Sequence, residues 1–230
     1  MSNSLNPENE PDDECVVNVN FDKSPDSDDV FNKLRNIRLN NIDWIIIANL
    51  NINSILSKLE QLYIIKENID ILVITETKTD ESHQGFHIDG YSKPFRADRN
   101  AHGGGVMIFV RDDIPCKQLN RHTFPGDIEG IFVEINLRKT KWLLFGSYHP
   151  PSQNDSYYFD CVSKGLDLYY PNYDKFILVG DFNAQDTGNN NQRAIEVVCF
   201  QAENKFCESR YSNTRSMSHS SVNRIPGFFH

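Results

Sequence analysis

Six polar side chains end apolar, strand-like stretches of this sequence, and together they could hydrolyse a phosphate ester. They are Asn51, Asn53, Glu76, Tyr148, Asp181 and Asn183. A hard cation takes oxygen ligands, which Glu76 could supply. A second carboxylate, Asp181, could orient and deprotonate a water molecule. Neutral donors such as the amides and the phenol could hold a phosphate without repelling it.

Each of these residues also has an ordinary explanation when it is taken alone. Asp181 and Asn183 are common turn formers at the end of a strand. A glutamate after a strand is most often a loop residue, and a tyrosine there is usually a core or rim aromatic. The asparagines of ANLNINS share one face of a strand, which would also suit an edge strand that turns. Only the combination favours a metal-assisted phosphodiesterase.

The elements that must position these side chains alternate between strand and helix patterns. Helical spacing of apolar residues predicts helices over 54–68 and 156–170. Strands are predicted over 44–52, 70–77, 103–113, 130–137, 141–151 and 175–183. Some of these strands alternate with period two and others are apolar throughout, which predicts sheets packed between helical layers.

The two ends of the chain differ from this middle part. Residues 1–40 are acidic, and the first 30 hold too few large apolar groups to offset their ordering entropy, so we expect this segment to be mostly disordered. An amphipathic piece over 30–39 predicts one short helix there. After residue 186 the pattern fades into a divergent polar tail, 187–230, with one helix-like patch at 194–200.

Charge and composition exclude several classes of function. The net charge of −9 argues against a nonspecific nucleic-acid coat, although not against an enzyme whose site holds a cation. A phosphate-facing surface would lie between residues 93 and 121, where basic residues outnumber acidic ones, but a solvated mixed-charge face explains this region equally well. No GKS/T or GxGxxG loop is present, so no nucleotide cofactor is expected.

Cysteine usage and hydropathy indicate an intracellular protein, nuclear or cytoplasmic. The five cysteines are scattered and form no CxxC pair, which is typical of reduced thiols. The longest apolar run is far below the about 18 residues that a membrane span needs. No apolar segment follows a basic N-terminus, so we expect neither a membrane contact nor a secretion signal.

Five motifs in order give the sequence a specific resemblance: NLNINSILSKLEQL, ILVITETK, GGGVMIFVRDDIP, LLFGSYHPPSQND and ILVGDFN. They closely resemble the endonuclease domain of non-LTR (LINE-type) retrotransposons. This domain is one of the endonuclease/exonuclease/phosphatase superfamily, with the apurinic/apyrimidinic endonucleases and the DNase I-like enzymes. The resemblance covers residues 41–186. It implies a DNase I-like four-layer α/β sandwich, two packed β-sheets flanked by helices, whose strand ends converge on one metal-binding cleft.

The resemblance also implies a role for each polar residue. It implies catalytic roles for Asn51, Tyr148, Asp181 and Asn183, and metal contacts for Glu76 and Asn53. Asp181 would activate water for in-line attack on phosphorus, with Mg²⁺, or alternatively Mn²⁺, as the cofactor. The partner would be DNA, bound through its phosphate backbone and nicked in one strand.

The family pattern ends with a Ser-Asp-His motif that this sequence lacks. No aspartate occurs after Asp186, and neither His219 nor His230 follows one. We therefore expect a domain without its last strands and a weakened enzyme. The alternative is a non-catalytic retrotransposon remnant with at most DNA- or protein-binding function, and a small-molecule phosphodiesterase is a third option. His102, before three glycines, would border the DNA cleft or simply enter a strand.

Overall fold

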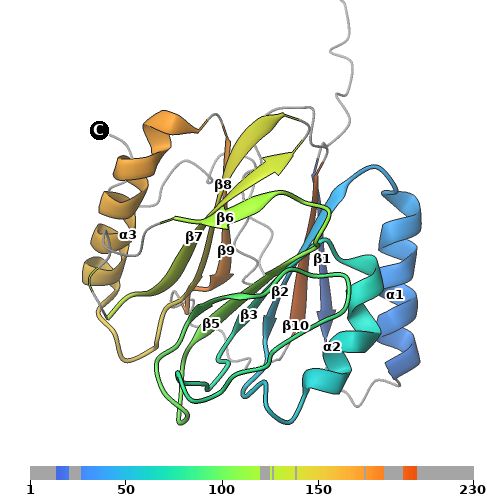
Figure 1. Cartoon of the computed structure of the whole chain (residues 1–230), viewed down its shortest axis with the longest axis horizontal. Coiled ribbons are helices and arrows are strands. Elements are labelled where there is room, and N and C mark those ends of the chain that lie inside the picture. Colours follow the sequence, from blue (N-terminus) through green and yellow to red (C-terminus); the bar gives the residue numbers. More distant parts are fainter. Residues whose placement is uncertain are drawn as a thin grey trace, which may run out of the picture.

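The structure, a computed structural model, describes residues 14–20, 27–119, 125, 127–137, 139–173, 175–183 and 194–200. Within these ranges two β-sheets face each other, and helices cover the outer face of each sheet (Figure 1).

The larger sheet has the strand order β1-β10-β2-β3-β5-β4. Its strands are β1 (Glu14–Asn20), β2 (Ile45–Asn51), β3 (Ile71–Thr75), β4 (Phe95–Ala97), β5 (Val106–Val110) and β10 (Ala194–Phe200). Only β2 and β3 pair in parallel, with Asn51 opposite Thr75. Parallel strands end at the same edge of a sheet, so Asn51 and Glu76 lie next to each other at the C-terminal ends of β2 and β3.

The smaller sheet has the strand order β6-β7-β8-β9. Its strands are β6 (Cys116–Gln118), β7 (Glu129–Leu137), β8 (Thr140–Tyr148) and β9 (Lys175–Asp181). Here β8 and β9 are the parallel pair, and their register sets Tyr148 opposite Asp181. Both sheets therefore carry one parallel pair with polar residues at its C-terminal end.

Helices form the two outer layers. They are α1 (Ser27–Asn40), α2 (Leu59–Ile65) and α3 (Asp155–Tyr169), with short 3₁₀ turns η1 (Lys66–Asn68) and η3 (Tyr170–Asn172). In Figure 1, α1 and α2 lie on one side of the sheets and α3 lies on the other. Among the described residues, no helix is both long and apolar enough to cross a membrane.

The buried apolar side chains form three clusters that coincide with the three spaces between layers. Alternation along a strand divides neighbours between them: Ile46 packs in the cluster under α1 and α2, whereas Ile47 packs between the sheets. In β8, Leu144 likewise faces the other sheet and Leu143 faces α3. The four-layer α/β sandwich expected from the sequence is thereby confirmed.

Two segments differ from the expectations for the ends of the chain. Residues Glu14–Asn20 were expected to be disordered, but they form β1. The helix-like patch Ala194–Phe200 is strand β10, which pairs with both β1 and β2. Both errors have one physical cause, because strand pairing between distant parts of a chain overrides local pattern. The rest of the two tails, residues 1–13, 21–26, 187–193 and 201–230, lies outside the described residues.

The remaining elements follow the sequence with shifted boundaries. The predicted helix over 30–39 is confirmed within α1, which begins at Ser27. The helix predicted over 54–68 is shorter, because α2 begins only at Leu59 and Ile55 is buried in the turn before it. The short strands β4 and β6 were not predicted, since three residues are too few to show a period.

Candidate active site

Asn51, the last residue of β2, lies at the centre of a polar cluster between the two sheets. Its Nδ2 atom donates to Oε1 of Glu76 and to Oδ2 of Asp181, at 2.9 Å in each case. A carboxamide nitrogen carries two hydrogens, so one group can serve both carboxylates. Asn51 therefore joins a carboxylate that follows β3 to a carboxylate that ends β9.

Glu76 follows β3 directly and takes a left-handed backbone conformation, with φ of 52°. Its backbone oxygen accepts from Ser54 N (2.8 Å), which ties it to the turn after β2. The carboxylate atom Oε1 also accepts from the hydroxyl of Tyr148 at 3.2 Å. Several non-glycine residues around this site have positive φ, and such strain is held only where surrounding structure fixes it: Asn53, Ser54, Glu76, Lys78 and Asn183.

Asp181 ends β9 and is mostly enclosed. Burial raises the pKa of its carboxyl group above the ordinary 3.8, and hydrogen bonds from Asn51 and from the backbone N of Asn183 oppose that increase. The neighbouring charge of Glu76 raises the pKa further. Asp181 is thus a stronger base than an exposed aspartate.

Tyr148 and Asn183 complete the cluster from the smaller sheet. Burial, and then the nearby charges of Glu76 and Asp181, raise the pKa of the Tyr148 phenol, so it stays a proton donor at neutral pH. Asn183 donates from Nδ2 to the backbone oxygen of His149 (2.9 Å). His149 is buried, and its Nδ1 lies 2.7 Å from the carbonyl oxygen of Phe182. It therefore supports the loop after β9.

Gly180 explains how β9 brings Asp181 so close to β8. A Cβ atom on Gly180 would lie 1.9 Å from the carbonyl oxygen of Ser147. A Cβ atom cannot approach a backbone oxygen so closely, so only glycine fits between the two parallel strands here. The small residue in VGDFN is thus part of how the site is placed.

Asn53 lies beside the cluster, but its carboxamide oxygen accepts a hydrogen bond from the ammonium group of Lys78. Lys58 approaches the backbone oxygen of the same asparagine, at 3.2 Å. Neither lysine was identified from the sequence. Lys78 could have been, because it lies two residues after Glu76 in the motif ETK. The predicted metal contact of Asn53 stays a prediction.

The donor set can be tested against a divalent cation. Glu76 Oε1 accepts two hydrogen bonds, whereas Oε2 has no hydrogen-bond donor within the described part of the chain. Among those residues no group of three or more His, Cys, Asp or Glu forms a closed metal cage. Mg²⁺ suits this arrangement, because it keeps several waters and uses one or two carboxylates. Glu76, with Asp181 nearby, fits such a cation.

Two further charged residues lie near the site: Arg99, which belongs to the basic stretch between residues 93 and 121, and Glu129, which was not singled out from the sequence. Arg99 Nη1 pairs with Oε1 of Glu129 at 2.9 Å, and Glu129 stands opposite Tyr148 across the β7–β8 pair. Glu129 directly precedes the strand predicted over 130–137 and is the first residue of β7, and nothing in the pattern distinguishes it from a surface residue. His102, the histidine that could border the cleft, is exposed in the turn before the glycines.

Three solved structures show partial similarity to this chain. The endonuclease domain of TRAS1, a telomere-specific non-LTR retrotransposon, shares 14% identity over 69% of this chain and 85% of its own, with a TM-score of 0.48. Truncated Caenorhabditis elegans TDP2 shares 12% identity over 70% of this chain and 85% of its own, with a TM-score of 0.46. An AP endonuclease from Archaeoglobus fulgidus shares 19% identity over 60% of this chain and 57% of its own, with a TM-score of 0.42.

Sequence comparison gives one family and no individual relative. No curated protein matches the chain. The sequence model described as Endonuclease/Exonuclease/phosphatase family matches residues 17–201. The matched range runs from β1 to β10 and contains every residue of the cluster around Asn51.

Proposed function

The chain belongs to the endonuclease/exonuclease/phosphatase family, and on that premise we propose that it is a magnesium-dependent endonuclease that nicks DNA. Family membership gives a phosphodiesterase-type hydrolase. The observation that carries the proposal is the Asn51 carboxamide, which joins Glu76 and Asp181 from two different sheets. A base, an open carboxylate oxygen and neutral donors thereby face one small volume.

Asp181 is assigned as the general base that takes the proton of the attacking water. Its raised pKa makes it a better proton acceptor, while the hydrogen bonds from Asn51 and Asn183 keep the ionised form available. Asn51 holds this carboxylate and Glu76 in fixed relative positions. Tyr148 and Asn183 donate to the oxygens of the phosphate as negative charge builds on them.

Glu76 is assigned as the carboxylate that holds Mg²⁺, and Mn²⁺ would be accepted as a substitute. When bound, the cation supplies charge neutralisation at the phosphate. The protein holds Glu76 through its bonds to Asn51 and Tyr148, which both use Oε1, so Oε2 would be available to the cation. No nucleotide cofactor and no membrane contact form part of the proposal.

A retrotransposon origin is part of the same proposal. It is supported by the order and the amino-acid sequences of the motifs around Asn51, Glu76, Tyr148 and Asp181, which resemble those of LINE-type endonuclease domains. In such an element the nick supplies the 3′ hydroxyl that primes reverse transcription. An intracellular location, nuclear or cytoplasmic, is also part of the proposal, and the five scattered cysteines without a CxxC pair support it.

The test is nicking of supercoiled plasmid DNA by the 230-residue chain, with Mg²⁺ and with EDTA. We expect Mg²⁺-dependent nicking that Asp181→Ala abolishes, because the general base is lost. Asp167→Asn, a change of an exposed α3 carboxylate, is the matched control and should nick like the wild type. Equal nicking by wild type and Asp181→Ala would refute the proposal.

A non-catalytic remnant that binds DNA or protein is the second candidate, and one sequence observation favours it. Residues 187–230 contain no aspartate, so this chain lacks the Asp-His pair of the family motif. Loss of one preorganised donor costs about 10²–10³ in rate, so we expect nicking at least that much slower than by a relative with the pair. DNA binding without any nicking, in wild type and Asp181→Ala alike, would favour the remnant.

A further inference from the structure

Arg99 lies on the rim of the candidate site, in the segment between β4 and β5. The glycine turn that follows it is fixed to the chain just after Glu76, since Lys78 N donates to the carbonyl oxygen of Gly104 at 2.9 Å. The guanidinium also acts on the cluster, because its charge opposes the increase in the pKa of Tyr148. Arg99 therefore lies near the residues assigned to hydrolysis, but it is not one of them.

Glu129 is the group that holds Arg99. The side chain of Glu129 is only 8% exposed, and burial raises the pKa of its carboxyl group, an effect that Arg99 opposes. Oε1 accepts from Arg99 Nη1 at 2.9 Å, while Oε2 accepts from the backbone N of Gly105. Because each oxygen has a different donor, the carboxylate does not engage both prongs of the guanidinium.

The guanidinium is thus oriented without using all its donors. Nε donates to the carbonyl oxygen of Gly103 at 2.9 Å, and Nη2 has no hydrogen-bond partner within the part of the chain that the structure describes. A Cβ atom on Gly103 would lie 2.6 Å from Nη2, and one on Gly104 would lie 2.7 Å from Cζ. The glycines therefore allow the planar group to lie flat against the turn while the side chain stays 38% exposed.

We propose that Arg99 binds a backbone phosphate of the substrate next to the one that is hydrolysed, and that Glu129 and the Gly103–Gly105 turn hold its guanidinium for this contact. The inference rests on the proposed function, since it assumes DNA at Glu76. A polyanion needs cations at the rim of an acidic site in a protein of net charge −9. A planar guanidinium suits phosphate, because it can donate two parallel hydrogen bonds.

Arg96, on the same segment, shows the contrasting arrangement. Its guanidinium pairs with Asp98 at 3.0 Å and donates to the carbonyl oxygens of His83 (2.7 Å) and Asp80 (3.1 Å). That side chain is only 15% exposed, so Arg96 serves the structure of the loop. Arg99 has the same charge, an Nη2 group without a partner among the described residues, and a more open position.

The experiment measures binding of a short fluorescein-labelled DNA duplex by anisotropy, in EDTA so that the duplex stays intact, over a series of salt concentrations. Arg99→Gln should weaken binding about ten-fold or more, the effect of one lost charged hydrogen bond. It should also lower the slope of log Kd against log salt by about one. Arg99→Lys keeps the charge but lacks the fork, so it should keep the slope and lose affinity several-fold.

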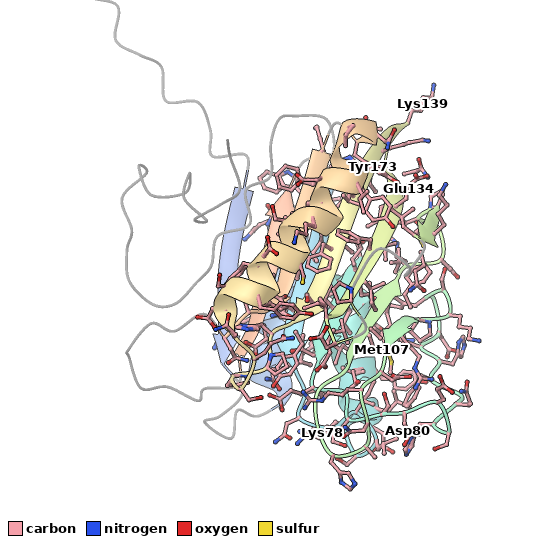
Figure 2. All side chains as sticks on the ribbon, turned by 90° about the vertical axis from the view of Figure 1, so that its left-hand side faces the viewer. Lys78, Asp80, Met107, Glu134, Lys139 and Tyr173 are labelled. Atoms are coloured by element: carbon pink, nitrogen blue, oxygen red, sulfur yellow. The ribbon has the colours of Figure 1, made fainter. Side chains whose placement is uncertain are left out.

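Lys139→Gln is the matched control, because it removes one positive charge from an exposed turn at the end of the molecule opposite Lys78 (Figure 2). It should leave affinity and slope unchanged. Wild-type affinity and slope in both Arg99 variants would overturn the inference alone. Failure of the wild-type chain to bind the duplex would overturn the proposed function with it. If Arg99→Gln does not fold, the affinity of Arg99→Lys for the duplex is the test. A several-fold loss of affinity supports the inference, and wild-type affinity overturns it.

Discussion

At the scale of single residues, the site depends on one carboxamide between two carboxylates. Glu76 and Asp181 would repel each other if both were ionised in a poorly solvated volume, and the charge of Glu76 does raise the pKa of Asp181. Asn51 offsets this by donating to both groups. Removing Asn51 would leave the carboxylates in place but without the donor that keeps Asp181 ionised.

We therefore predict that Asn51→Ala lowers kcat/KM for plasmid nicking by about 10²–10³, as for loss of one preorganised donor. The acid limb of the pH–rate profile should also move. As the proposed general base, Asp181 would act in its ionised form, so activity should be present above its pKa and be lost as the pH falls through it. Burial raises that pKa above 3.8 and Asn51 lowers it, so the limb of the variant should lie at higher pH.

Asn172→Ala, a change of an exposed asparagine in η3, is the control for this measurement. It should keep both the rate and the position of the limb. An Asn51→Ala enzyme whose limb coincides with that of the wild type would show that Asp181 is not the titrating base. The measurement is the initial nicking rate across the acid range at saturating Mg²⁺.

At the scale of secondary structure, two parallel strand pairs place the site. The β2–β3 register brings Asn51 beside the start of the Glu76 turn, and the β8–β9 register sets Tyr148 opposite Asp181. Because β8 and β9 must approach without a side chain between them, Gly180 has a steric role that the neighbouring residues of β9 do not share.

We predict that Gly180→Ala lowers the free energy of unfolding by about 3 kcal/mol or more, since its Cβ would overlap the backbone of β8. Gly85→Ala separates steric from conformational cost, because Gly85 has positive φ but no atom within 4 Å of its Cβ position. That control should lose only about 1–2 kcal/mol. Urea denaturation of both variants gives the comparison, and equal losses would contradict the steric account.

Helix α1 offers a second test at this scale, because it lies in the segment expected to be mostly disordered. Leu34 is 1% exposed in the cluster under α1 and α2, whereas Leu39 on the same helix is 56% exposed. Leu34→Ala should destabilise the fold by about 2–5 kcal/mol. Leu39→Ala should change stability by no more than about 0.5 kcal/mol. Similar effects of the two changes in urea denaturation would mean that α1 does not dock as described.

At the scale of the whole molecule, the larger sheet is completed by segments far apart in the chain. Strand β10 pairs with β1 on one side and with β2 on the other. Its backbone groups are therefore engaged on both edges, whereas β1 has one described partner. Such pairing makes Ala194–Phe200 part of the same cooperative unit as β2, the strand that carries Asn51.

We predict that amide hydrogen exchange in Ala194–Phe200 is slowed to the same degree as in β2, because both strands open only with the sheet. Exchange in Glu14–Asn20 should be faster, since β1 is paired on one described edge. Mass spectrometry of pepsin fragments would measure both. Rapid exchange throughout Ala194–Phe200 would show that this strand does not belong to the folded unit.

The sequence by itself determined the strands of the middle region, the layered class of the fold, and the polar residues that end the strands. These are local properties: periodicity follows the geometry of one strand or helix, and residue type sets what chemistry a side chain can do. Asn51, Glu76, Tyr148 and Asp181 were all identified in this way, and the structure brings their side chains into hydrogen-bond contact.

Only the tertiary structure decided what depends on distant partners. Ala194–Phe200 is a strand because β1 and β2 lie on either side of it, and its own residues did not show this. The hydrogen bond between Asn51 and Asp181 and the ion pair between Arg99 and Glu129 likewise join residues far apart in the chain. The raised pKa of Asp181 depends on burial that such distant contacts produce. Burial and hydrogen bonding arise only when sheets close over each other, so no local pattern contains them.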